Sequence, residues 1–176
     1  GLDAFTAYDV TCYMNSFPAY QMERWLTLYA DRLTNPVFRS FQAELENVFE
    51  EYNMYLDDNS THSRNFIFGK LYEGHAYARD IIGYPEDLKK PKLRQLIDFY
   101  HTWYVPNNMA LILVGDFDIE ATKPLIEKTF GKLEARPLPE RTQYPTTAFE
   151  QDERYSAKLG YMPELYIAYN GVPVGD

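Results

Sequence analysis

The spacing of apolar residues along the chain predicts a succession of helices and strands. Apolar residues recur three or four positions apart in five segments, which is typical of helices with one buried face. These predicted helices cover residues 17–33, 39–56, 63–71, 91–104 and 119–130. Ser16 is the expected N-cap of the first helix, whose inner face is expected to carry Met22, Leu26, Tyr29 and Leu33. Residues 72–91 are expected to form an ordered loop.

Four segments rich in β-branched, aromatic or aliphatic residues predict strands. They cover residues 4–13, 109–115, 154–160 and 165–170. The run Met109–Gly115 is the most apolar, and we expect it to be a central strand buried on both faces. Strands in mixed order with long helices between them predict an α+β fold, in which helices pack on one face of a mixed or antiparallel sheet.

The predicted helix over 39–56 carries two glutamates of interest. Phe41, Leu45, Val48 and Tyr52 share one apolar stripe, while Glu46 and Glu50 are expected to point toward water. Glu44 and Glu51 are seven residues apart, on nearly one bearing at the edge of that stripe. Such a pair suits a metal ligand with an assisting carboxylate, but in an acidic chain it is more typical of a solvated helix edge.

Composition and charge exclude several classes of function. Hydrophobic residues make up 45% of the 176, so the chain can bury a core and one domain is expected. The formal net charge is −9 and no Lys/Arg run exceeds two residues, which argues against binding to nucleic acid or to an anionic membrane surface. No apolar run reaches membrane-spanning length.

Local spacing does not reveal a complete active site. Cys12 is the only cysteine, so no intrachain disulfide can form, and no nucleophile motif surrounds it. His62, His75 and His101 lack the spacing of a helical metal pair, and each is expected to be structural. A zinc ion needs ligands beyond the Glu44/Glu51 pair.

Five sequence blocks, in order, resemble the zinc peptidases of the insulinase/pitrilysin family (peptidase family M16). The resemblance covers residues 1 to about 133 and resumes at the last predicted strand. The blocks are Asp3-Ala4-Phe5-Thr6 with Thr11-Cys12-Tyr13; Asp31-Arg32-Leu33-Thr34-Asn35-Pro36-Val37-Phe38; Glu44 and Glu51 with Asp57 or Asp58; His75, Tyr77, Arg79 and Ile81-Ile82-Gly83; and Phe99-Tyr100, Tyr104, Pro106-Asn107-Asn108-Met109 and Val114-Gly115-Asp116.

The resemblance implies a fold, a cofactor and residue roles. It implies the metallohydrolase fold shared by LuxS and processing peptidases, and a zinc endopeptidase that hydrolyses peptides bound in extended form. Zinc is held in the family by a His-x-x-Glu-His helix and a distant glutamate, which matches Glu51. Glu44 matches an assisting carboxylate, and Asp3, Ala4, Phe5 and Thr6 match the edge strand to which substrate adds.

The chain departs from the family pattern at two places. Asp3 stands where the family has Asn, so a side-chain amide donor is lost. The His-x-x-Glu-His motif is absent, and in the family it lies upstream of the early strand. We therefore expect a piece of a longer peptidase that is inactive alone, binds zinc weakly or not at all, and self-associates through uncovered apolar surface.

The domain organisation and partners are further expectations from the resemblance. We expect one truncated domain over 1–176, with the core over 1–133, a connecting segment over 134–150 and late strands over 151–176 leading toward a following domain. The resemblance implies a peptide or protein substrate, a second half of the same fold, and a bacterial periplasmic or cell-envelope location. The alternatives are a non-catalytic partner half that binds peptide or scaffolds, and an unrelated acidic binding domain.

Overall fold

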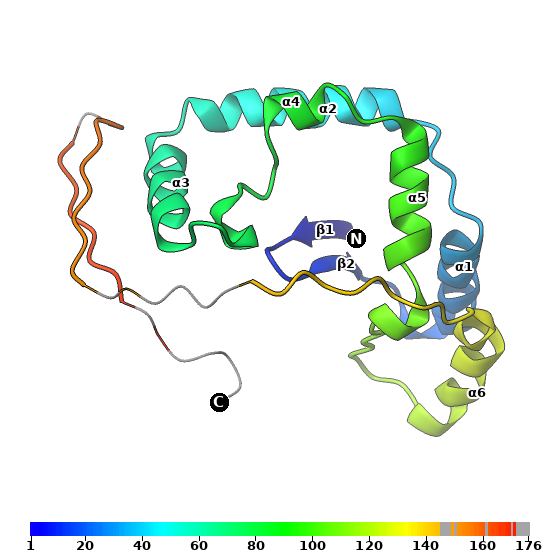
Figure 1. Cartoon of the computed structure of the whole chain (residues 1–176). Coiled ribbons are helices and arrows are strands. Elements are labelled where there is room, and N and C mark those ends of the chain that lie inside the picture. The colour runs from blue at the N-terminus through cyan, green and yellow to red at the C-terminus, as the bar shows by residue number, and fades with distance from the viewer. Residues whose placement is uncertain (145–148, 150, 161, 170, 172–176) are drawn as a thin grey trace. The chain divides into compact units, whose positions relative to one another are not determined.

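The computed structural model describes residues 1–144, 149, 151–160, 162–169 and 171 (Figure 1). Contacts between Cα atoms divide the chain into two compact units. Unit 1 comprises Gly1–Thr6, Val10–Phe41 and Pro91–Arg141. Unit 2 comprises Ala7–Asp9, Gln42–Lys90 and the described residues from Thr142 onward.

Unit 1 begins with the strands of an antiparallel β-hairpin. Strand β1 (Leu2–Thr6) pairs with β2 (Thr11–Asn15), with Ala4 opposite Tyr13 and Phe5 opposite Cys12. The prediction of one strand over residues 4–13 is therefore wrong, because the chain reverses direction over residues 7–10. A connection of this length needs turn-forming residues, and Asp9 is the turn-forming residue in it.

The main helix of unit 1 is α1 (Met22–Thr34), preceded by the short 3-10 helix η1 (Ala19–Gln21). Met22, Leu26 and Ala30 are buried along one face, while Tyr29 and Leu33 are half-buried. Ser16 does not cap this helix, contrary to the sequence prediction. Its backbone N–H and C=O instead pair with Gly1 at the end of the hairpin, at 3.0 Å in both directions.

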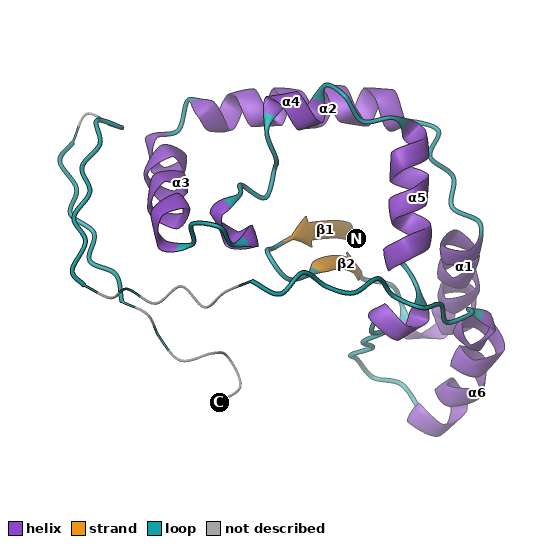
Figure 2. Cartoon of the chain, in the orientation of Figure 1, coloured by secondary structure: helices purple, strands orange, loops and turns teal. Residues whose placement is uncertain are grey.

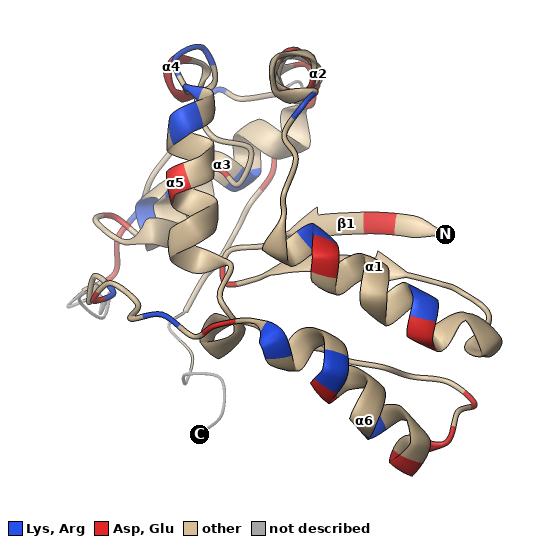
Figure 3. Ribbon diagram, turned by 90° about the vertical axis from the view of Figure 1, so that its right-hand side faces the viewer, with Lys and Arg blue, Asp and Glu red and all other residues tan. Residues whose placement is uncertain are grey.

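Two further helices complete unit 1. Helix α5 (Leu93–Trp103) is followed by η3 (Pro106–Asn108), and α6 (Ile119–Thr129) by η4 (Phe130–Lys132). Helix α6 lies beside α1, with charged positions of both signs along each (Figure 3), and the Lys128 ammonium lies 3.0 Å from the Glu23 carboxylate. The Tyr100 hydroxyl of α5 donates to the Leu33 carbonyl at 2.9 Å, which fixes α5 against the end of α1.

Unit 2 is built from helices. The long helix α2 (Phe41–Leu56) agrees closely with the predicted segment 39–56, and all of it except Phe41 belongs to unit 2. Helix α3 (Asn59–Leu71) begins four residues before the predicted 63–71, because the Asp58 side chain caps it by accepting from Ser60 N–H. The predicted loop 72–91 contains two short helical segments, η2 (Ala76–Ala78) and α4 (Pro85–Leu88).

Three predicted strands are wrong for the residues that the structure describes. Segments 109–115, 154–160 and 165–169 have no strand structure (Figure 2), and residue 170 lies outside the described residues. Ile112 and Val114 are 79% and 92% exposed, so Met109–Gly115 is not a buried central strand. A strand needs a neighbour to satisfy its backbone groups, and the sheet in the described chain consists of β1 and β2 alone.

The architecture therefore combines many helices with a small antiparallel sheet. This confirms the mixed class of the α+β prediction, while the larger sheet with helices on one face is not seen in the described residues. Buried apolar side chains among them are few, namely Met22, Leu26, Ala30 and Val105, and all belong to unit 1. No helix in the described part of the chain is both long enough and apolar enough to cross a bilayer.

Candidate functional site: helix α2 and the edge of β1

Glu44 and Glu51 lie on one side of α2, and both are exposed. Seven residues of helix span about 10 Å along the axis, so one small ion can be bound directly by only one of the two carboxylates. The Tyr55 hydroxyl donates to Glu51 Oε1 at 3.1 Å, and this hydrogen bond raises the pKa of Tyr55. The bond orients the Glu51 carboxylate while leaving it open to solvent.

The predicted apolar stripe of α2 is only partly covered. Phe41, Leu45, Val48 and Tyr52 are all half-buried, as expected for the inner side of an amphipathic helix. Glu44 and Glu51, however, are exposed rather than half-desolvated. Their surroundings in the described chain are therefore those of solvated carboxylates.

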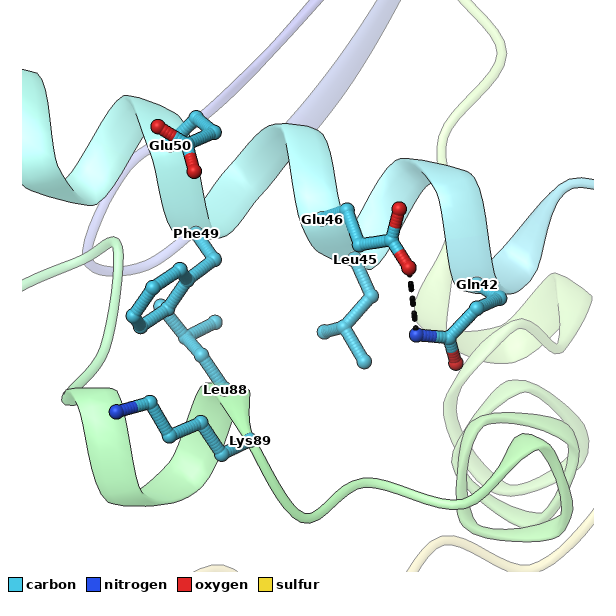
Figure 4. Close-up of a pocket in the computed structure, with 7 residues that line it drawn as sticks. All are labelled: Gln42, Leu45, Glu46, Phe49, Glu50, Leu88 and Lys89. Carbon is cyan, nitrogen blue, oxygen red and sulfur yellow. Dashed lines mark hydrogen bonds between the residues drawn. The ribbon is translucent and has the colours of Figure 1, made fainter.

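The described residues also form a hollow of about 240 Å³ between α2 and α4 (Figure 4). Its lining residues are Gln42, Leu45, Glu46, Phe49, Glu50, Leu88 and Lys89. The Lys89 ammonium lies 4.9 Å from the centre of the Phe49 ring, and Gln42 Nε2 donates to Glu46 Oε1 at 3.1 Å. By helical periodicity these residues lie on the side of α2 away from Glu44 and Glu51. Glu46 and Glu50 are exposed as predicted, but they line this hollow.

Sequence reasoning missed this hollow because two of its seven lining residues, Leu88 and Lys89, come from the end of α4. Leu88 and Lys89 lie at the end of a four-residue helix within a segment that we expected to be a loop. The available signal was Pro85, since proline is favoured at the first positions of a helix.

The four predicted substrate-binding residues, Asp3 to Thr6, all lie in β1 and are all exposed. Gly1 and Ser16 exchange two backbone hydrogen bonds, and hydrogen-bonded pairs alternate with non-hydrogen-bonded pairs along an antiparallel hairpin. With this register, the Asp3–Met14 and Phe5–Cys12 pairs are hydrogen-bonded, and the N–H and C=O groups of Leu2, Ala4 and Thr6 point away from β2. The outward Ala4 N–H donates to the Asp3 carboxylate, Oδ1, at 2.9 Å.

The three histidines make local contacts. A His62 ring nitrogen, Nε2, lies 2.7 Å from the Leu56 carbonyl oxygen. His75 Nδ1 accepts from the Tyr77 backbone N–H at 3.1 Å. The His101 ring lies edge-on to Tyr100, with centroids 5.9 Å apart.

An aromatic cluster in unit 2 surrounds His75 and was not predicted. Tyr8 stacks on Phe68 with ring centroids 5.6 Å apart and lies 4.8 Å from Tyr77, while the His75 ring lies 4.6 Å from Tyr77. The Tyr77 hydroxyl donates to the Asp9 carboxylate, and this bond raises the pKa of Tyr77. These contacts hold the loop after α3 in place.

The described residues fit a contribution to a zinc site rather than a complete site. No group of three or more His, Cys, Asp or Glu residues that could hold a metal ion occurs in the part of the chain that the structure describes. Glu51 offers one exposed anionic oxygen ligand, whereas tetrahedral zinc in a peptidase needs three protein ligands.

Comparison with known proteins yields matches to one family. The model of the domain described as "Peptidase M16 inactive domain" matches residues 92–176. The chain is 29% identical over 155 residues to the probable zinc protease PqqL of Escherichia coli, covering 84% of this chain and 16% of that protein. It is 32% identical over 133 residues to the uncharacterized zinc protease YmfH of Bacillus subtilis, covering 74% of this chain and 31% of that protein.

Solved structures give the same result. The periplasmic protease PqqL from E. coli superposes with a TM-score of 0.70 at 25% identity, covering 82% of this chain and 16% of that one. The first half of PqqL, solved by itself, gives a TM-score of 0.68 at 25% identity and covers 82% of this chain and 32% of that one. The chain thus spans between a sixth and a third of the length of these relatives. Its similarity is to the insulinase/pitrilysin-like zinc peptidases, peptidase family M16.

Proposed function

We propose that this chain is part of a zinc-dependent endopeptidase that hydrolyses peptides bound in extended conformation. The relatives PqqL and YmfH are named zinc proteases, and this supports the reaction class. The proposed complete fold is the one shared by LuxS and processing peptidases, in which helices cover one face of a larger mixed sheet.

Glu51 is the proposed third zinc ligand, and its open carboxylate on α2 is the observation that carries the proposal. The carboxylate is exposed and is oriented by the Tyr55 hydroxyl at 3.1 Å, so an ion can reach it without unfolding the helix. Glu51 would hold zinc together with ligands from outside this chain, and a zinc ion held there would supply Lewis-acid chemistry for peptide hydrolysis. Glu44, two turns earlier on the same side, is proposed to assist by adding negative charge and hydrogen-bond acceptors near the ligand.

Strand β1 is the proposed substrate-pairing edge. One side of β1 is paired with β2, and the outward N–H and C=O groups of Leu2, Ala4 and Thr6 have no strand beside them in the described chain. An extended peptide gains main-chain hydrogen bonds by adding to such an edge. Because these bonds involve only backbone groups, β1 accommodates many sequences and leaves selectivity to side chains near the edge.

The partner, location and domain organisation proposed here follow the relatives. The first half of PqqL is among the structural neighbours, which supports a second M16-like half that acts together with this chain. PqqL is described as periplasmic, which supports a location in the bacterial cell envelope. We further propose one domain over 1–176, with a core over 1–133, a connection over 134–150 and a late segment over 151–176 that leads to the following domain.

The 176-residue chain by itself is proposed to be inactive and to bind zinc weakly. A single glutamate ligand with one assisting carboxylate cannot hold a tetrahedral ion tightly. Elemental analysis of the purified chain, after equilibration with micromolar zinc, is expected to show far less than one zinc per chain. Stoichiometric tight binding would contradict this, because it would require a histidine of the chain to join Glu51.

The role of Glu51 is tested in a protein that joins this chain to a His-x-x-Glu-His helix. Glu51→Gln is expected to lose both zinc and peptidase activity, because a neutral amide is a much poorer zinc ligand. Glu44→Gln is expected to keep most of the zinc and lose about tenfold in turnover. The matched control is Glu46→Gln, the same substitution on the opposite side of α2, which should change neither. Full zinc and full rate in Glu51→Gln would refute the assignment.

A non-catalytic half that binds peptide or scaffolds a partner is the second candidate. The observation in its favour is the match of residues 92–176 to a domain described as inactive. Glu44 and Glu51 lie before the matched residues, so that match does not bear on them. Zinc analysis of the longer natural protein distinguishes the two candidates. A peptidase with an intact His-x-x-Glu-His helix is expected to retain zinc through Glu51, whereas a non-catalytic half is expected to retain none.

A further inference from the structure

The edge of β1 carries one charged side chain, and it is bonded to the strand's own backbone. Asp3 is the only charged residue in β1 or β2, and its Oδ1 lies 2.9 Å from the Ala4 amide nitrogen. Ala4 is opposite Tyr13 in a pair that is not hydrogen-bonded, so its N–H points away from β2. The carboxylate therefore occupies the backbone donor in the middle of the free edge.

An incoming strand must compete with Asp3 for this donor. In strand addition a carbonyl of the peptide accepts from each outward N–H, and Ala4 supplies the central one of β1. A hydrogen bond from an amide to a carboxylate is stronger than one to a neutral carbonyl. Exchange at Ala4 therefore replaces a stronger bond by a weaker one and releases a charged side chain at the edge of the newly formed sheet.

Resting on the proposed role of β1 as the pairing edge, we propose that Asp3 is a specificity-determining residue of that edge. Its carboxylate competes with an incoming peptide for the Ala4 N–H. Peptides that make no compensating contact with the displaced carboxylate therefore bind less tightly. A Lys or Arg side chain beside the released carboxylate restores a charge-assisted contact, so cationic extended peptides are admitted. A glutamate or aspartate at the same place meets a like charge, so acidic peptides are disfavoured.

No basic side chain in β1 or β2 offsets this selectivity at the edge. The facing strand β2, Thr-Cys-Tyr-Met-Asn, contains no basic residue, so neither strand holds a cation for the carboxylate. The formal net charge of −9 acts in the same direction, since it attracts cationic peptides at long range. The experiment must therefore separate the local effect of Asp3 from the effect of total charge.

The test measures peptide binding to the 176-residue chain by fluorescence anisotropy. The probe is a labelled peptide of about ten residues that alternates Thr and Val, with Lys, Gln or Glu at its centre. The wild-type chain is expected to bind the Lys peptide about fivefold more tightly than the Glu peptide. Asp3→Asn keeps an acceptor for the Ala4 N–H but removes the charge, and this preference should fall to nearly one.

Two further variants complete the set. Asp3→Ala removes the acceptor as well, which frees the Ala4 N–H, so it is expected to bind the neutral Gln peptide about threefold more tightly than the wild type. Asp87→Asn, at an exposed position in α4, makes the same change in total charge and should retain the wild-type preference.

The outcomes distinguish this inference from the proposed function. If peptides bind but the Lys/Glu preference is equal in the wild type and Asp3→Asn, the edge role stands and the inference about Asp3 is overturned. An equal loss of preference in Asp87→Asn also overturns it, because total charge would then be the cause. If no variant binds any of the peptides, the edge role of β1 itself is refuted, and the inference with it.

Discussion

Substitution of Leu26 by alanine tests whether α1 is the centre of the core of unit 1. Leu26 is fully buried, and Met22 and Ala30, one turn to either side, are buried with it. Replacing a buried leucine by alanine costs about 2–5 kcal/mol, through lost transfer energy and the cavity that remains. With few other buried apolar residues in the described chain, we expect little collapse around the site and a cost of about 3 kcal/mol.

Urea unfolding followed by far-UV circular dichroism measures this cost. With an m-value of about 2 kcal/mol per molar urea, the midpoint should fall by about 1.5 M. Leu28→Ala is the matched control, because Leu28 lies in the same helix and is 55% exposed. It should leave the midpoint within about 0.3 M, since alanine is also a strong helix former. Equal losses in the two variants would refute the assignment of Leu26 to the core.

The remaining predictions concern a half-buried tyrosine hydroxyl and a helix cap. Burial, followed by the hydrogen bond between the Tyr104 and Tyr13 hydroxyls at 2.6 Å, raises the pKa of Tyr104 well above its usual value. The folded chain therefore keeps this proton above pH ~10 while the unfolded chain releases it, so stability should fall as pH rises past about 10. Urea midpoints at rising pH should show this fall, and Tyr104→Phe should weaken it; an equal fall in the variant would contradict the account. Asp118→Ala removes the acceptor 3.0 Å from Ala121 N–H at the start of α6. It should cost about 1 kcal/mol by urea unfolding, whereas Asp116→Ala, two residues before the Asp118 cap, should cost almost nothing.

The helices were predictable because their signals are local. Helix α2 begins and ends within two residues of the predicted bounds, since its apolar spacing lies entirely within the segment. Helix α3 was predicted to start too late because the capping role of Asp58 was not recognised. The hairpin was read as one strand because residues 7–10 contain no glycine or proline to mark the reversal.

The strands and the site depend on contacts distant in sequence, so the sequence predicted them less well. The apolar run Met109–Gly115 has strand composition, but strand structure requires a neighbouring strand, which the described chain does not place there. Helical spacing correctly put Glu44 and Glu51 on one side of α2. Spacing could not show how far each carboxylate is exposed, or that Asp3 would bond its neighbour's amide, because both depend on the folded surroundings.

The exposed run Met109–Gly115 also bears on how a cell would handle this chain. Its seven residues carry no charge and no proline, and Ile112 and Val114 are 79% and 92% exposed. Short segments of this composition are the ones that form stacked intermolecular β-structure. In living cells, molecules that expose such segments are sorted continuously by chaperones and proteases. The abundance of the chain in vivo would then depend on how quickly another strand covers this run after synthesis, and less on the stability of its helices.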